Sequence, residues 1–473
     1  MIGVIVSKEL RTLSRNRVLL GFTLAITALM FVAALMGQAR VDAFDRERAD
    51  AAATDRAVWL AQGERNPHSA AHFSRYAFKP IPALALFDPG SLDYAGIALW
   101  MEAHNQNPAV YRRAEDRSDL QLFAELSPAW ILQVFGPLIV FCAMFAAMAG
   151  EREDGTLRQL LSIGVSPRSI MVGKVVGGIV ALLLIFSPGL LLSLPLVSQS
   201  ASVVPTADQS FRVLSIAGAY LMTLAIYVLL ALGVSSLAKS RRSAFLALLV
   251  IWGASVIAVP RIAGDVAATL HPQPEAREIR RTLSQAAGAY RQATDLRERE
   301  LAELLERYNV ASETDLPVSY AAFSLQRSEE VAHPLFEKIY GDLADNHGRQ
   351  DTVLGWFSAA SPTLALARLS AGLAGVDRFH HEHFVWAAET HRRKIVKQMN
   401  DDMFEHAAGT DGRYLSSADF WETIDDFPYR PPAFSAFRHE YAAAAFALSL
   451  QLLLALGFAT WAMGRSQKLE RAG

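Results

Sequence analysis

Six apolar segments, each long enough to cross a lipid bilayer as a helix, constrain this chain more than any other feature. A bilayer core is about 30 Å thick and a helix rises about 1.5 Å per residue, so a crossing needs roughly 20 apolar residues. Hydrophobic residues make up 52% of the 473 residues and are concentrated in these segments. The expected spans are 18–37, 129–149, 169–197, 211–238, 243–262 and 441–464.

Lysine and arginine beside the short connections set the expected orientation, because cytoplasmic flanks carry an excess of both. Basic residues precede the first span, lie between spans two and three and between spans four and five, and follow the sixth. The opposing short loop, 198–210, has neither lysine nor arginine. We therefore expect both termini, including the tail 465–473, on the cytoplasmic side.

Two long polar segments, 38–128 and 263–440, then fall on the extracytoplasmic side. Leucines between 283 and 305 recur on a charged background, which is typical of amphipathic helices. Another helix is expected over 383–402, and no clear strand alternation is evident. The predicted fold class is an all-α polytopic membrane protein with six spans and a mostly helical extracytoplasmic domain formed by the two insertions.

The connection 150–168, "EREDGTLRQLLSIGVSPR" after Gly150, is unusual for a short loop between two spans. Thr156 begins a short helix whose leucines at i, i+3 and i+4 form one apolar face. Acidic residues precede it, where the helix dipole favours negative charge, and Pro167 ends it. From the residues alone, docking into a cytosolic partner and lying on lipid headgroups are equally supported.

The N-terminal segment 1–17 is amphipathic. Apolar side chains share one face, whereas Lys8, Arg11 and Arg15 line the other. This pattern is typical of a helix that lies in the headgroup plane, so membrane lipid is an expected partner.

The connection 150–168 resembles a loop of ABC type-two (ABC-2) transporter permeases, whose pattern is E-R-E-x-G-T-L followed by a leucine-rich helix. In that family the loop is the coupling helix, which occupies a cleft of the ATP-binding subunit. The N-terminal "VIVSKELRTLSRNR" resembles the family's interfacial elbow helix. Carried over by this resemblance, the expected ATPase contacts are Glu151, Arg152, Glu153, Gly155, Thr156, Leu157, Leu160 and Leu161.

Segments 70–107 and 361–401 resemble a branch of these permeases with large outer insertions and a domain of unknown function. That branch is related to the copper-enzyme (nitrous oxide reductase) maturation permease. The resemblance implies a bacterial inner-membrane permease, either exporter-type or working on the outer face of the membrane. It leaves the direction of transport open, and also the substrate, among copper or sulfur species, peptides, siderophore-like molecules and lipids.

The partners follow from what the chain lacks. No G-x-x-x-x-G-K-[ST] loop for ATP phosphates occurs, so ATP and Mg²⁺ are expected on a separate cytosolic ATPase, and no cofactor is expected on this chain. Six spans match half a transporter, which calls for a second permease copy, identical or related. A periplasmic or outer-membrane protein is a further candidate partner. The net charge of −2 gives no reason to expect nucleic acid.

Within the spans, Lys174 lies near the cytoplasmic end and is expected to extend its ammonium to the interface. Gly173, Gly177 and Gly178 suit close helix packing, with an interface between two copies as one use.

The main metal-ligand candidates are histidines. His380, His381 and His383 surround Glu382, yet no second ligand pair at fixed spacing accompanies them, so solvation or packing is the favoured interpretation. The same interpretation is applied to His68, His72 and His104.

Neither G-x-S-x-G nor H-E-x-x-H occurs, and no enzyme activity is expected. The favoured function is a permease subunit of an ATP-driven transporter. The alternatives are a membrane receptor or sensor, and a membrane-anchored enzyme that uses the extracytoplasmic domain.

Overall fold

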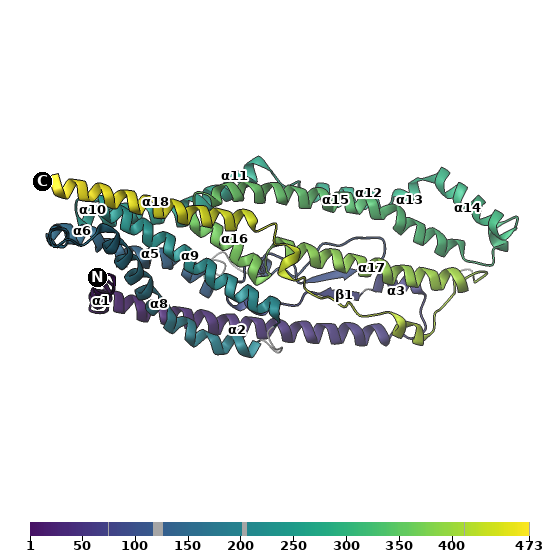
Figure 1. The fold of residues 1–473 in the computed structure, drawn as a ribbon. Helices are drawn as coiled ribbons and strands as arrows, with labels where there is room; N and C mark the ends of the chain where they lie inside the picture. Colours follow the sequence, from purple (N-terminus) through teal and green to yellow (C-terminus); the bar gives the residue numbers. More distant parts are fainter. Residues whose placement is uncertain (74, 117–125, 201–205, 411, 473) are drawn as a thin grey trace.

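The apolar segments form long helices in the computed structural model, which describes residues 1–73, 75–116, 126–200, 206–410 and 412–472. The molecule is elongated, with both termini at one end, here called the terminal end, and a second helical region at the other, here called the distal domain (Figure 1). Six helices in the described residues are long and apolar enough to cross a membrane, which confirms the predicted fold class. They are Arg17–Leu60, Pro128–Glu153, Pro167–Leu192, Ala207–Leu237, Arg241–Leu270 and Ala442–Ser466.

The spanning region is a helical bundle around α9. This helix packs against α5, α8, α16 and α18, and its side chains Tyr220 and Tyr227 belong to the largest buried cluster. The elements of this region are α1 (Ile2–Ser14), α2 (Arg17–Leu60), α5 (Pro128–Met144), α6 (Ala146–Glu153), α7 (Thr156–Ser162), α8 (Pro167–Ser200), α9 (Ala207–Leu237), α10 (Arg241–Trp252), α11 (Val259–Leu270), α16 (Pro362–Ala374) and α18 (Ala442–Ala472).

Helix α2 continues without a break from the first span into the distal domain. Its N-terminus is capped by Asn16, whose side chain accepts from the amide of Val18 at 3.0 Å. The 44 residues extend over about 66 Å at 1.5 Å per residue. Near its far end, Trp59 is buried and donates to the carbonyl of Trp421 at 3.0 Å. One rigid element therefore links the terminal end to the distal core.

The distal domain combines both polar insertions, as the predicted fold class requires. Trp59 and the helix α3 from the first insertion share a buried cluster with α17 and Trp421 from the second. The predicted helix 383–402 lies within α17. The domain contains α3 (Pro67–Phe73), α12 (Ala276–Ala287), α13 (Ala289–Gln292), α14 (Thr294–Tyr308), α15 (Tyr320–Ser358) and α17 (Arg378–His406).

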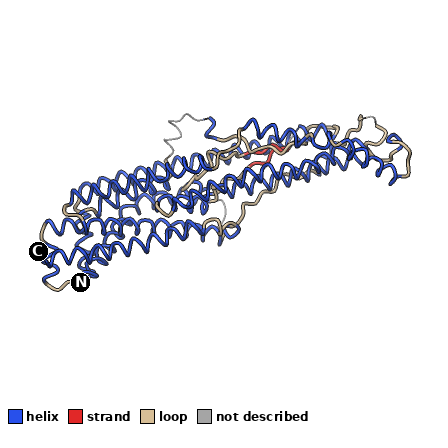
Figure 2. The backbone as a smooth tube through the Cα atoms, turned by 90° about the horizontal axis from the view of Figure 1, so that it is seen from above, coloured by secondary structure: helices blue, strands red, loops and turns tan. Residues whose placement is uncertain are grey.

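A small hairpin, which sequence patterning did not indicate, packs against α17 and α2. Figure 2 shows its two strands among the helices. Strands β1 (Arg75–Phe78) and β2 (Ala98–Met101) are antiparallel, with Arg75 opposite Met101 and Phe78 opposite Ala98. Four residues per strand are too few for a period of two to stand out in the sequence.

Part of the segment 263–440 lies between the spanning helices. The end of α15, the turn after it and α16 pack beside α9 and α18, so the outer insertion re-enters the bundle. Buried Gln451 on α18 donates to the carbonyls of Ser358 and Ala359 at 2.8 and 2.9 Å. These bonds satisfy backbone groups that would otherwise be unpaired inside the bundle, which is the condition for irregular backbone at membrane depth.

A π-helical segment, Gly253–Ala258, packs against the other side of this turn. In π register the carbonyl of Ser255 would pair with the backbone nitrogen of Pro260, which carries no hydrogen. The hydroxyl of Ser361 donates to that carbonyl instead, at 2.5 Å. Ser361 also caps α16 by accepting from the amide of Leu364 at 3.0 Å.

Candidate functional site

The connection between α6 and α8 turns sharply at two glycines. Gly155 and Gly164 have φ values of +73° and +81°, which residues other than glycine rarely adopt. The seven-residue helix α7 lies between them, at the same end of the molecule as both termini. The short helix expected to start at Thr156 is therefore present, but it ends at Ser162, before Gly164. Pro167, which was expected to end it, is instead the first residue of α8.

The leucine face of α7 points inward. Leu157 is 1% exposed and belongs to the main buried cluster, and Leu160 and Leu161 pack against that cluster. The leucines that the family resemblance assigned to ATPase contact are thus covered wholly or partly by this chain. Between the two glycines, the exposed side chains are Arg158, Gln159, Ser162 and Ile163. Ile163, at 72% exposed, is the large apolar side chain among them.

Glu151 lies in a buried ionic cluster rather than at the surface. Its carboxylate is paired with Lys174 of α8 at 3.1 Å and with Lys8 of α1, and it accepts from the hydroxyl of Thr156. Lys174 is also paired with Glu9 of α1 at 2.8 Å. We call Lys8, Glu9, Glu151 and Lys174 the ionic cluster; it holds two charges of each sign.

The predicted interfacial position of Lys174 is wrong. Its side chain is 2% exposed and its ammonium is held between two carboxylates that come from α1 and α6. Because a buried charge is tolerated only when it is paired, the cluster fixes α1, α6 and α8 against one another. Of the predicted surface residues on α1, Arg11 and Arg15 are exposed, whereas Lys8 is half-exposed and belongs to the cluster.

Arg152, Glu153 and Asp154 bind the start of the connection to the other spans. Arg152 donates to the carbonyl of Ser236 in the last turn of α9 and to the hydroxyl of Ser466 on α18, both at 2.6 Å. Arg241, the first residue of α10, is paired with Glu153 at 2.9 Å and with Asp154 at 2.5 Å. The connection therefore makes polar contacts with α1, α8, α9, α10 and α18.

The glycines of α8 serve packing inside the chain. A Cβ added to Gly173 would lie 2.7 Å from Ile5, and one added to Gly177 would lie 2.9 Å from the Cβ of Glu9. A Cβ on Gly178 would meet Met144 at 2.9 Å. The first two glycines let α1 approach α8 closely. The glycine side of α8, which could have formed an interface between two copies, is therefore covered by α1 of the same chain.

Two family models match the chain. Residues 4–317, well over half of its length, match the model for the ABC-2 family transporter protein. The chain belongs to the ABC-2 transporter family. Residues 276–430 match a domain of unknown function, DUF3526, which covers most of the distal helices and the re-entrant turn. No match to a curated protein accompanies these two.

Membership of the ABC-2 family identifies the chain as the membrane component of an ABC-2 transporter, which is a multi-pass membrane protein. Subunits of this kind are typically not catalytic themselves, and the family implies an ATPase partner. The predicted link to copper-enzyme maturation is not part of either match.

The histidines of "HHEH" have separate partners in this ABC-2 protein. His380 Nδ1 lies 2.6 Å from Asp377, and His383 Nδ1 lies 3.2 Å from the hydroxyl of Tyr429. Burial and the charges of Lys79 and Arg112 lower the pKa of His381 to about 3. In the described part of the chain the group able to hold one metal ion consists of other histidines, His68, His72 and His104.

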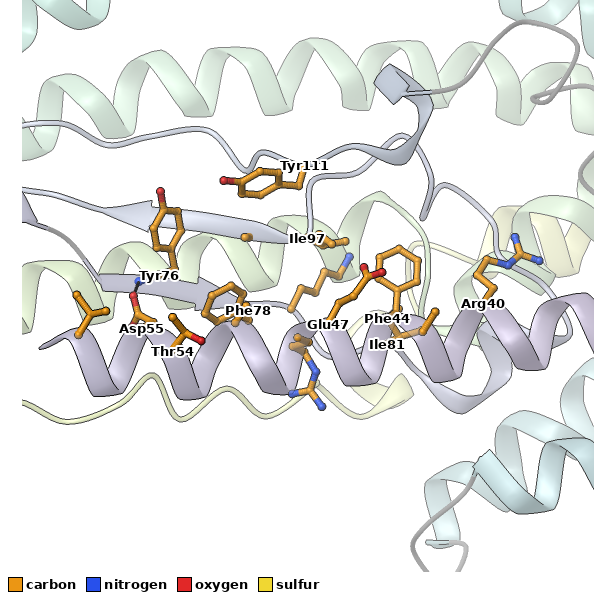
Figure 3. A pocket seen from close by; sticks show the side chains of 16 residues that line it. Arg40, Phe44, Glu47, Thr54, Asp55, Tyr76, Phe78, Ile81, Ile97 and Tyr111 are labelled. Carbon is orange, nitrogen blue, oxygen red and sulfur yellow. Dashed lines mark hydrogen bonds between the residues drawn. The ribbon is translucent and has the colours of Figure 1, made fainter. Parts of the chain in front are cut away.

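A cavity of about 720 Å³ lies between the outer half of α2 and the hairpin. Figure 3 shows Phe44 and Glu47 extending from α2 toward Ile97 and Tyr111. Lys79 also lines the cavity; it is 5% exposed, and burial lowers its pKa to about 8 despite the opposing charge of Asp377. Aromatic walls with a few charged groups suit a ligand with an apolar body and an anionic group.

Proposed function

We propose that this chain is the transmembrane subunit through which a cytosolic ATP-binding-cassette ATPase drives an exporter-type transporter of the bacterial inner membrane. In this proposal the terminal end faces the cytoplasm and the distal domain faces the periplasm. ATP and Mg²⁺ bind the ATPase, and a second permease copy, identical or related, completes the transporter.

The observation that carries the proposal is the set of contacts made by residues 150–168. Glu151, Arg152 and Glu153 bind other helices, and Leu157 is buried in the common core. A force applied to the exposed face of α7 would therefore reach several spans at once. A loop that only covered lipid headgroups would not need polar contacts to five helices.

The docking surface that we propose differs from the leucine face. The ATPase would contact the exposed side of α7, with Ile163 as the apolar anchor and Arg158 as a charged neighbour. Glu151, Arg152, Glu153, Thr156, Leu157, Leu160 and Leu161 would act by holding this surface in place, and Gly155 by allowing the turn before it.

The cavity between α2 and the hairpin is the site that we propose for the substrate during handover. Its aromatic side chains and the buried ammonium of Lys79 favour an amphipathic molecule with a negative charge. A periplasmic or outer-membrane protein would then accept the substrate from the distal domain.

Site-directed photo-crosslinking in the native host tests the docking surface. A benzoylphenylalanine in place of Ile163 should give an adduct that contains an ATP-binding-cassette ATPase, identified by mass spectrometry. The same amino acid in place of Lys338, which is 75% exposed on α15, is the matched control and should give no such adduct. Arg158→Glu should lower the amount of ATPase that co-purifies, whereas Lys338→Glu should not. Equal ATPase recovery at both positions would count against the proposal.

Cysteine labelling tests which side of the membrane α7 and the distal domain face. Cys142 is the chain's single cysteine, so removing it leaves an introduced cysteine as the one thiol that can react. In a Cys142→Ala background, Ile163→Cys should react with an impermeant maleimide in inside-out vesicles only. Lys338→Cys should react in right-side-out vesicles only. The reverse pattern would exclude a cytosolic ATPase at α7.

A further inference from the structure

Three histidines from separate parts of the first insertion meet in the distal domain. His68 and His72 lie four residues apart on α3, so their side chains share one face of the helix. His104 approaches them from the segment after β2. The ring centroids are 4.8, 5.3 and 5.3 Å apart, and one nitrogen from each ring lies within 4.8 Å of the others.

The third histidine is oriented by a buried carboxylate. His104 Nδ1 lies 3.0 Å from Oε1 of Glu329, which is 2% exposed. Because a carboxylate only accepts, Nδ1 carries the proton and Nε2 keeps a lone pair for a metal ion. Glu329 is itself held by Arg392, at 3.0 Å and fully buried. Metal-binding histidines typically have such an outer carboxylate, which fixes the ring and its tautomer.

The backbone at His104 adds a separate sign of constraint. Its φ is +66°, a conformation that costs free energy for any residue other than glycine. The amide of His104 donates to the same oxygen of Glu329, at 2.5 Å. Glu329 therefore holds both the backbone and the ring of His104 in the position that brings it to His68 and His72.

The triplet opens onto space for a further ligand. His68 and His104 line a cavity of about 1150 Å³ between the first insertion and helices α12, α13 and α15. Its wall includes polar groups, among them Asn105, Gln106 and Tyr290. An ion held by three imidazoles at the edge of this cavity would keep one coordination position accessible.

We propose that His68, His72 and His104 bind a divalent first-row transition-metal ion, with Zn²⁺ as the reference case, and that the fourth position faces the cavity. Imidazole suits Zn²⁺, Cu²⁺ and Ni²⁺, whereas Mg²⁺ and Ca²⁺ select oxygen ligands. Bonds of about 2.0–2.1 Å place tetrahedral nitrogen ligands about 3.3 Å apart, so nitrogens that now lie within 4.8 Å of one another need to close by up to about 1.5 Å. The inference stands apart from the ATPase, because it concerns only residues of the distal domain.

Metal titration of the full chain tests this site. The protein is purified in detergent without a polyhistidine tag, stripped with a chelator, and titrated calorimetrically with Zn²⁺. We expect one ion per chain and no heat from Mg²⁺. His72→Ala should lower the affinity by more than the roughly 10–100-fold that the loss of an outer-shell partner costs. His72 is exposed, so this variant should fold normally.

Three variants test whether the ion binds this triplet rather than other histidines. His439→Ala removes a 71% exposed histidine elsewhere and should leave Zn²⁺ binding unchanged. Glu329→Gln should keep the stoichiometry, lower the affinity about 10–100-fold and alter the visible spectrum of bound Co²⁺, since Glu329 positions His104. Unchanged binding in His72→Ala, or loss of binding in His383→Ala instead, would overturn the proposal.

Discussion

Replacing Lys174 by methionine would remove the positive charge between two buried carboxylates. Lys174 Nζ lies 2.8 Å from Glu9 and 3.1 Å from Glu151. At an effective dielectric constant of about 20, each attraction is worth roughly 5–6 kcal/mol before the desolvation of the ions is subtracted. Breaking a buried ion pair by removing one partner typically costs about 3–5 kcal/mol. We expect Lys174→Met to lower the free energy of unfolding by about 3–5 kcal/mol.

A double variant separates charge imbalance from lost packing. Lys174→Met with Glu9→Gln leaves Lys8 and Glu151 as a neutral, bonded pair, so most of the loss should be recovered. The measurement is unfolding of the purified chain in mixed micelles by a denaturing detergent, followed by circular dichroism. Lys338→Met, at an exposed pair, should leave the free energy of unfolding nearly unchanged. A loss below about 1 kcal/mol in Lys174→Met, or equal losses in the single and double variants, would refute the reasoning.

Three further changes test other parts of the structure. Gln451→Leu should destabilise the chain by about 1–3 kcal/mol for each of the two carbonyls of Ser358 and Ala359 that it leaves unpaired, measured by the same unfolding assay with Gln451→Asn as a comparison. Gly177→Leu should separate α1 from α8 and cost about 1–3 kcal/mol, seen also as faster proteolysis of the N-terminus; unchanged proteolysis would contradict the close contact. Burial lowers the pKa of Lys79 to about 8, whereas the unfolded chain keeps this proton to about pH 10.4. The free energy of unfolding should therefore rise between these pH values, and Lys79→Met should lack that rise while being more stable at pH 7.

The spans and the short helix after Gly155 could be predicted because their signals are local. Twenty consecutive apolar residues, or a glycine followed by leucines three and four apart, are read from neighbouring positions. The leucine pattern shows that α7 has an apolar face, but it does not say whether this chain or another covers it. Leu157 is buried by other helices of this chain, and this burial depends on the folded structure rather than on the local sequence.

The ionic cluster and the histidine triplet could not be found in the same way. Lys174 and Glu9 are separated by 165 positions, so no spacing rule connects them. A lysine near the end of a span usually reaches the interface, which made burial the less expected outcome. Part of the histidine signal was local, since His68 and His72 have the i, i+4 spacing of a helical ligand pair. The third member, His104, comes close only because β1 and β2 fold back on each other.

The position of α2 explains how an event at the terminal end could change the distal cavity. The ionic cluster fixes α1 to α8, and α2 packs along α8 before continuing to the buried Trp59. A straight helix of about 66 Å that tilts by about 5° moves its far end by about 6 Å. The cavity near Phe44 and Lys79 has α2 as one wall and the hairpin as another, so such a tilt would change its width directly. The re-entrant turn held by Gln451 attaches the second insertion to the spans, and α17 of that insertion packs against β2 of the hairpin. Under the proposed mechanism, coupling would need no bending of any helix, only a change in the angle between α2 and the rest of the bundle.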